Sequence, residues 1–347
     1  MSRLNASICF VAMAVLLDVG SACFAGETAF RWEATPGRSL ALVGRNAIVW
    51  RFNYAHDQPK PFFDPVSLVS GESLTWNQPP DHAWHHAFWF SWKTINGINY
   101  WENNTQTGRP VGRTAWKEPV VSTDPSGAAR IELELSYSPP GSDPLLHETR
   151  IVDISAPNND GQYHFDWDAT FCAGEHDVVL DRTPIPPDPN GTPWGGYAGL
   201  SLRFAENLAD RQAVTDRGEV EFDSSGIHRS HGIACDYHGN LNGRPAGIAV
   251  LSHPSNPRHT TPWYAIRTNM SYLNPAFLAE EPYTIKAGNA LRLRYRVIIH
   301  PGGWNSERLQ KEATLYDRDT ERVAISWRRP TSRSRPPTSP ISPKTRQ

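Results

Sequence analysis

The sequence predicts an all-β fold, a large antiparallel β-sandwich with few short helices. Apolar and polar residues alternate in several segments, including 129–137, 164–171 and 291–300, as is typical of strands with one buried face. No strand–helix repetition is visible, and proline and glycine interrupt the chain often. Together these observations favour antiparallel sheets over an α/β fold. One helix is expected late in the chain, beginning at Asn305 or Ser306.

The N-terminal segment is typical of a secretory signal. Arg3 precedes an apolar stretch over residues 6–17, which is too short to span a bilayer, and small residues follow it. Cleavage after Ala25 is expected, and a lipid anchor on Cys23 is the less favoured alternative. We therefore expect a secreted or periplasmic protein without a transmembrane segment.

The C-terminal segment, residues 328–347, is basic, rich in proline and serine, and free of aspartate and glutamate. Such a composition cannot bury enough apolar surface to fold, so a disordered tail is expected. The predicted organisation is therefore a signal peptide (1–25), one β-sandwich domain (27–327) and a tail (328–347).

Composition narrows the classes of partner. The net charge of −2 argues against a nucleic-acid-binding protein, whereas 13 tryptophans offer many flat surfaces for stacking sugar rings. After the signal only Cys172 and Cys235 remain. They could form one disulfide or remain two buried thiols.

The most unusual stretch is "DHAWHHAFWFSW", Asp81 to Trp92. Asp81 and His82 follow the loop-like "NQPP", and a strand is expected from His86 onward. In a regular strand His86 would share a face with Phe88, Phe90 and Trp92, and His85 would point to the other face. The three histidines therefore do not predict a metal site of their own.

Other polar clusters follow further along. The proline-braced loop "SHPSNPRHTTPWY" begins at Ser252, "SSGIHRSHGIACDYHG" contains Asp236 and His238, and the segments "WGGYAGLSLRF" and "NMSYLNPAF" carry tyrosines and polar groups. Nothing in the sequence matches a metalloprotease, nucleophile-elbow, phosphate-loop or paired-cysteine motif. No cofactor and no metal are expected.

The candidate site residues have two expected roles. Acid/base or other catalytic roles are expected of Asp81, His85, His86, Asp236 and His259. Substrate binding is expected of residues that offer hydrogen bonds or ring faces: His82, Trp92, Tyr197, Arg203, His253, Asn256, Arg258, Trp263, Tyr272 and Asn274. These residues form one site only if the segments 81–86 and 253–263 meet in space together with Asp236.

Five segments carry a resemblance to a known family: "DHAWHHAFWFSWKTINGINYWE", "WGGYAGLSLR", "ACDYHG", "AGIAVLSHPSNPRHTTPWY" and "LNPAF". In this order they resemble an exported bacterial family labelled "methane oxygenase PmoA", also described as a domain of unknown function. The resemblance covers about residues 75–300, and "HPSNPRHTTPWY" is its most specific part. Ala83 and Ala87 stand where that family commonly has proline and glycine. The resemblance implies a supersandwich like that of galactose mutarotase, and members tend to occur beside proteins of polysaccharide degradation. The label itself conflicts with a chain that has no membrane span after its signal.

Three functional hypotheses follow. The first is a secreted hydrolase or lyase acting on a glycan or glycoside, with a histidine as acid/base and an Arg/Asn/His loop holding the sugar. The second is a non-catalytic glycan-binding module, and the third a histidine-ligated metal oxidase or oxygenase. A purely structural role is the remaining alternative, and the oligomeric state is left open.

Overall fold

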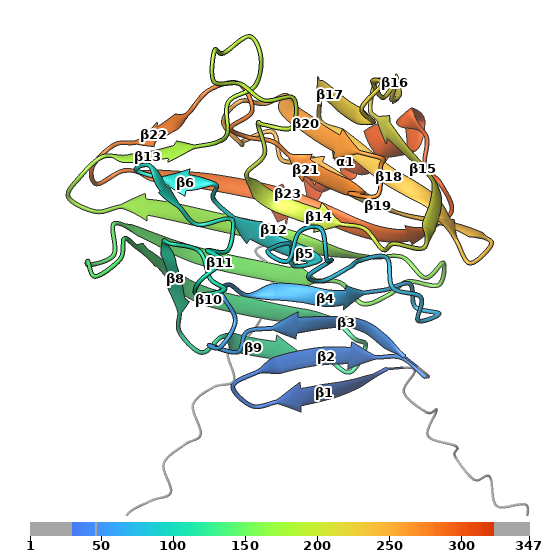
Figure 1. The fold of residues 1–347 in the computed structure, drawn as a ribbon. Coiled ribbons are helices and arrows are strands. Elements are labelled where there is room, and N and C mark those ends of the chain that lie inside the picture. The colour runs from blue at the N-terminus through green and yellow to red at the C-terminus, as the bar shows by residue number, and fades with distance from the viewer. Residues whose placement is uncertain (1–29, 46, 323–347) are drawn as a thin grey trace, which may run out of the picture.

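The structure, a computed structural model, describes residues 30–45 and 47–322. The predicted signal peptide and the predicted tail lie outside these residues. Within them the protein is nearly all-β: 23 strands and one helix, with every strand pairing antiparallel (Figure 1). The predicted all-β, antiparallel sandwich is confirmed.

The first sheet has nine strands and carries the aromatic-rich segment of the sequence. Its order is β1 (Arg31–Thr35), β2 (Ser39–Val43), β3 (Ile48–Asn53), β4 (Phe62–Val66), β5 (Phe88–Ser91), β14 (Gly199–Arg203), β21 (Tyr272–Pro275), β20 (Thr261–Ile266) and β17 (Ile227–Gly232).

The second sheet has ten strands and contains the longest ones. Its order is β16 (Gly218–Glu219), β15 (Leu208–Thr215), β18 (Ala234–Leu241), β19 (Arg244–Ser252), β23 (Ala290–Pro301), β12 (Tyr163–Ala173), β11 (Leu146–Ile154), β10 (Ala129–Ser138) and β8 (Arg113–Trp116), with β9 (Val120–Thr123) also paired to β10. A small third sheet has the order β22 (Tyr283–Ile285), β13 (Val178–Asp181), β6 (Thr94–Ile95) and β7 (Ile98–Asn99).

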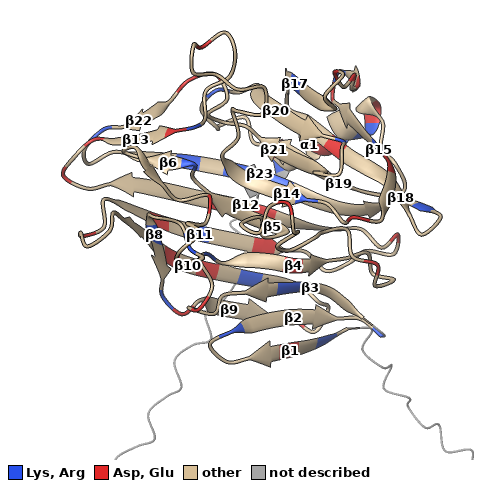
Figure 2. Ribbon diagram, viewed as in Figure 1, with Lys and Arg blue, Asp and Glu red and all other residues tan. Residues whose placement is uncertain are grey.

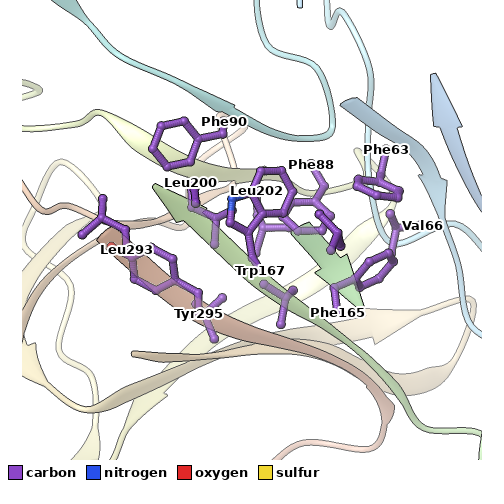
Figure 3. Packing of buried hydrophobic residues seen from close by; sticks show 14 of the residues in the cluster. Phe63, Val66, Phe88, Phe90, Phe165, Trp167, Leu200, Leu202, Leu293 and Tyr295 are labelled. Atoms are coloured by element: carbon purple, nitrogen blue, oxygen red, sulfur yellow. The ribbon is translucent and has the colours of Figure 1, made fainter. Parts of the chain in front are cut away.

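The main core lies between the two large sheets. Phe88 and Phe90 of β5 meet Phe165 and Trp167 of β12 there (Figure 3). Strands β10 and β12 alternate strictly between buried and more exposed residues, so the sequence periodicity identified their core faces correctly. The core also encloses one ion pair, in which Arg150 Nε donates to Glu148 Oε1 at 2.6 Å and the guanidinium lies 4.7 Å from the centre of the Trp167 ring.

Helix α1 (Ser306–Arg322) packs on the outer face of the ten-stranded sheet, against β15, β18 and β19 (Figure 1). Asn305 caps it, because its Oδ1 accepts the Arg308 amide at 2.9 Å. The predicted helix and its start are confirmed.

Acidic and basic residues are interspersed over the molecule (Figure 2). No helix among residues 30–45 and 47–322 is long and apolar enough to cross a membrane. Cys172 and Cys235 are free thiols, the first exposed and the second buried. The disulfide alternative therefore does not hold, and the alternative of two buried thiols holds for Cys235 but not for Cys172.

Trp167 provides a stability test of the sandwich core. Its ring is buried and contacts Phe63, Phe88 and Phe90. Trp167→Ala should lower the free energy of unfolding by about 3–5 kcal/mol, because it leaves a large cavity. Trp194→Ala is the matched control, because Trp194 is 58% exposed. It should change the free energy of unfolding by less than about 0.5 kcal/mol. Equal effects in chemical denaturation would contradict this assignment of the core.

Candidate functional site

The outer face of the nine-stranded sheet carries a second aromatic cluster. Because side chains alternate along a strand, Trp89 of β5, Tyr264 of β20 and Tyr272 of β21 point away from the main core and pack together. Trp101 and Phe62 join them. Both faces of these central strands are therefore buried, and the loops that cover the outer face define the candidate site.

The segment before β5 forms a tight loop over this face. Gln78 N donates to His85 O at 2.7 Å, and His85 N donates to His82 O at 2.9 Å. Ala87 then adopts a left-handed backbone conformation, with φ 64°, immediately before the strand begins. This conformation interrupts the regular alternation of side chains.

The expected separation of His85 and His86 is wrong for this reason. The centres of the His86 and Phe62 rings are 4.8 Å apart, and the centres of the His85 and Trp89 rings are 5.0 Å apart. Phe62 and Trp89 are register partners on the outer face. Both histidines thus lie on the outer face, whereas Phe88 and Phe90 enter the main core as expected.

A cavity of about 290 Å³ opens between the covering loops. It is lined by His82, His85, Trp194, Tyr197, Met270 and Tyr272. We call it the His82 pocket. Trp194 and Tyr197 come from the long Pro/Gly-rich loop between β13 and β14. Arg229 fixes that loop by donating to the carbonyls of Pro193 and Gly195 at 2.7 and 2.8 Å.

His82 is oriented by a carboxylate. Its Nδ1 lies 3.0 Å from Asp81 Oδ2, and Arg203 Nη2 donates to both Asp81 oxygens at 2.9 and 2.8 Å. Burial alone would raise the pKa of Asp81, but the Arg203 and His82 hydrogen bonds and charges outweigh it and lower that pKa. An ionised Asp81 requires Nδ1 of His82 to be the protonated nitrogen, so Nε2 is the basic atom of the neutral ring.

His85 forms the floor of the pocket. Its ring stacks on the rings of His82 and Tyr272, with ring centres 4.7 and 5.5 Å apart, and only 2% of the residue is exposed. Burial, and then the positive charges of His82 and Arg203, lower its pKa well below the usual value. His85 is therefore neutral, and its buried Nδ1 has no hydrogen-bond partner among the described residues.

Two further charged groups lie behind the aromatic wall. Lys60 is buried and donates to Ser91 Oγ, Tyr100 O and Trp101 O at 3.2–3.3 Å. Burial lowers the pKa of Lys60 to about 7, and Glu102 only partly opposes this. Glu102 pairs with Lys93 and accepts a hydrogen bond from Tyr197 Oη at 3.3 Å.

Glu102 stays ionised in this position. Burial would raise its pKa, but the Lys93 charge and the Lys93 and Asn99 hydrogen bonds lower the pKa overall. Tyr197 therefore connects the pocket to a second carboxylate.

The proline-braced loop does not reach the His82 pocket. Asn256 Nδ2 donates to Arg294 O at 2.7 Å, and Arg258 Nη1 donates to Phe277 O at 2.7 Å, so both side chains brace backbone. His253 packs on Tyr316 of α1, and His259 is exposed away from the pocket. The segments 81–86 and 253–263 therefore do not line one pocket, and the condition for a single site built from both is not met.

Four other candidates are also placed elsewhere. Trp92 and Trp263 are buried in the main core and offer no ring face to a ligand. Asn274 lies on the outer face but donates to Ala198 O at 3.0 Å, which braces the neighbouring strand. Asp236 belongs to β18, on the other large sheet.

A metal ion has no set of ligands here. Among residues 30–45 and 47–322, no group of three or more histidine, cysteine, aspartate or glutamate side chains is arranged to hold one. The pocket contributes two imidazoles, and the carboxylate nearest to His82 is engaged by Arg203. The donors present do not fit the metal oxidase hypothesis.

Sequence reasoning missed Trp194, Met270 and Lys60. Trp194 had a signal, because it is an indole within a long loop, and exposed aromatic residues in loops often bind ligands. Lys60 follows a proline and precedes a strand, and nothing in its surroundings in the sequence indicates burial.

Comparison with known proteins adds a family. Residues 39–314 match the model described as "Family of unknown function (DUF6807)", and this description gives no support to the methane oxygenase label. No curated protein matches the sequence.

One similar solved structure is described as "Putative kojibiose phosphorylase from human microbiome", with 8% sequence identity and a TM-score of 0.31. The match covers 86% of this chain and 37% of that one, so the chain spans little more than a third of that protein's length. A likeness of this extent carries no inference about activity.

The left-handed residue Ala87 can be tested by substitution. Ala87→Val places a β-branched side chain at φ 64° in a fully buried position, and it should lower the free energy of unfolding by about 1–3 kcal/mol. Ala87→Gly, which adopts this conformation freely, should remain within about 1 kcal/mol of the parent. Equal stability of the two variants in urea denaturation would show that the backbone conformation at 87 is different.

Lys60 should make stability depend on pH. Its pKa is about 7 when folded and about 10.4 when unfolded, so between these values the unfolded chain binds more protons and stability rises with pH. From pH 7.5 to 9.5 the parent should gain about 1–3 kcal/mol relative to Lys60→Met. Denaturation curves for both proteins at both pH values measure this, and a constant difference between them would refute the burial of an amine.

Proposed function

Since this chain belongs to the family of unknown function DUF6807, its activity has to be inferred from its site, and we propose a carbohydrate-active enzyme. It would cleave a glycan or small glycoside, as a hydrolase or a lyase, with the sugar in the His82 pocket and His82 as the acid/base. The observation that carries this proposal is an imidazole oriented by an ionised carboxylate at the wall of an aromatic pocket.

The walls of the pocket suit a sugar ring. Trp194, Tyr197 and Tyr272 offer aromatic surface to the C–H faces of a pyranose. The volume of about 290 Å³ is at the lower end of ligand pockets, which suits one sugar unit. Because the aromatic side chains come from strands and a braced loop, the surface is held in place before a ligand binds.

His82 is the side chain best placed for proton transfer. In hydrolysis, Nε2 of protonated His82 would donate its proton to the glycosidic oxygen as the C–O bond breaks. Water would then add to the anomeric carbon and return a proton to Nε2. His85, kept neutral by burial, would contribute hydrogen bonding without competing for the positive charge.

A second candidate function is glycan binding without catalysis. It is favoured by one observation: the residues that line the pocket include no carboxylate, and most glycoside hydrolases use two. Glu102 does not line the pocket but accepts a hydrogen bond from Tyr197, which does. A signal peptide, if present as the sequence predicts, would place either function outside the cytoplasm.

The decisive experiment combines turnover with binding. Purified protein would be assayed with a panel of 4-nitrophenyl glycosides and plant-type oligosaccharides, and binding would be measured by calorimetry. For a glycoside that is cleaved, His82→Gln should lower kcat/KM by at least about 100-fold with little change in affinity. Trp194→Ala should weaken binding about tenfold through the loss of a stacking face.

His231→Gln is the matched control, because His231 is half-exposed and pairs with Glu280 at 3.0 Å outside the pocket. His231→Gln should leave both kcat/KM and the binding affinity unchanged. Full turnover in His82→Gln would refute the acid/base role. Binding of an oligosaccharide by the parent without any product would select the non-catalytic alternative.

A further inference from the structure

A buried carboxylate on the ten-stranded sheet lies outside the site described above. Asp236 of β18 is fully buried, and its oxygens accept hydrogen bonds from His238 Nδ1 at 2.7 Å, His300 Nε2 at 2.9 Å and the Trp304 amide at 3.2 Å. Burial would raise its pKa, but the two histidines lower the pKa to about 2. Asp236 is thus a permanent anion that determines the orientation of two imidazole rings.

His238 differs from His300 in facing a pocket. Its Nδ1 is engaged by Asp236, so Nδ1 carries the proton and Nε2 is the basic atom. The His238 side chain is 14% exposed and lines a cavity of about 540 Å³, whereas His300 is fully buried. We call this cavity the His238 pocket.

Two glycines make room for the His238 ring. A Cβ atom at position 247 would lie 2.6 Å from the His238 Cβ, and one at position 303 would lie 3.1 Å from the ring nitrogen Nε2. A side chain at position 247 would force the His238 side chain or its surroundings to shift, and a side chain at position 303 would crowd the His238 ring. The absence of side chains at positions 247 and 303 therefore leaves the space that the His238 ring occupies.

Arg308 of α1 supplies a cation to the same pocket. Its Nη2 lies 2.8 Å from Glu312 Oε1 and 3.4 Å from Gln162 Oε1. Its Nε is buried, and in residues 30–45 and 47–322 it has no acceptor. The rest of the lining is mostly polar, including Gln212 and Glu219, which suits the hydroxyl groups of a ligand.

We propose that the His238 pocket is a second reaction centre, which hydrolyses an acyl ester of a small hydroxylated molecule. His238 Nε2 takes a proton from water while the water oxygen bonds to the acyl carbon, and Arg308 stabilises the resulting oxyanion. The acyl–oxygen bond then breaks, and the proton on Nε2 passes to the departing alkoxide. The products are a carboxylic acid, which ionises, and an alcohol, so the step needs only water.

This activity is separate from the proposed glycoside cleavage. The His238 pocket shares no lining residue with the His82 pocket, and the two are built on different sheets. Failure of either proposal therefore leaves the other intact.

The test uses the full chain and 4-nitrophenyl acetate as the probe at pH 8, with release of 4-nitrophenolate followed over many turnovers. His238→Gln should lower the protein-dependent kcat/KM by about 100-fold. His231→Gln, which removes a half-exposed histidine outside the pocket, should retain it within twofold. Thermal melting would establish that each variant is folded.

Arg308→Gln provides a second arm if His238→Gln fails to fold. The Arg308 side chain is 38% exposed on α1, and loss of its charge should lower kcat/KM by about 100-fold. Undiminished turnover in a folded His238→Gln or Arg308→Gln would overturn the proposal. An absence of turnover in the parent, or a single stoichiometric burst, would overturn it as well.

Discussion

The ion pair between Arg203 and Asp81 is the interaction on which the candidate site depends. Arg203 ends strand β14 with no exposed side-chain surface, and a buried guanidinium without an anion would be strongly destabilising. Asp81 supplies that anion from the covering loop and uses the same carboxylate to orient His82. One interaction therefore attaches the loop to the sheet and sets the tautomer of the candidate acid/base.

The nine-stranded sheet makes this possible because its central strands are buried on both faces. Phe88 and Phe90 fill the sandwich core, while Trp89, between them, belongs to the outer aromatic cluster. The outer aromatic cluster gives the covering loops an apolar surface to pack on. The pocket is therefore lined by side chains of the sheet on one side and by side chains of the loops on the other. The ten-stranded sheet is also covered on its outer face. There the cover is helix α1, and the buried polar group is Asp236.

Much of the fold could be predicted from the sequence, but less of the site. Alternation identified the core face of β12, and Asn305 indicated the start of α1. His86 was assigned to the wrong face, because one left-handed residue, Ala87, interrupts the period that such reasoning assumes. Asn256 and Arg258 were interpreted as ligand-binding groups, but they hold backbone carbonyls. Composition alone does not distinguish polar groups that brace a loop from those that bind a substrate.

The most direct test of the account is the tautomer of His82, read from its ring ¹⁵N chemical shifts by NMR at pH 8. The Asp81–Arg203 pair predicts a proton on Nδ1 and an unprotonated Nε2 in the parent. Asp81→Asn should lose this preference, because a neutral amide no longer favours the N–H of the ring. A parent protein with the proton on Nε2 would contradict the claim that Asp81 prepares His82 for proton transfer in the pocket.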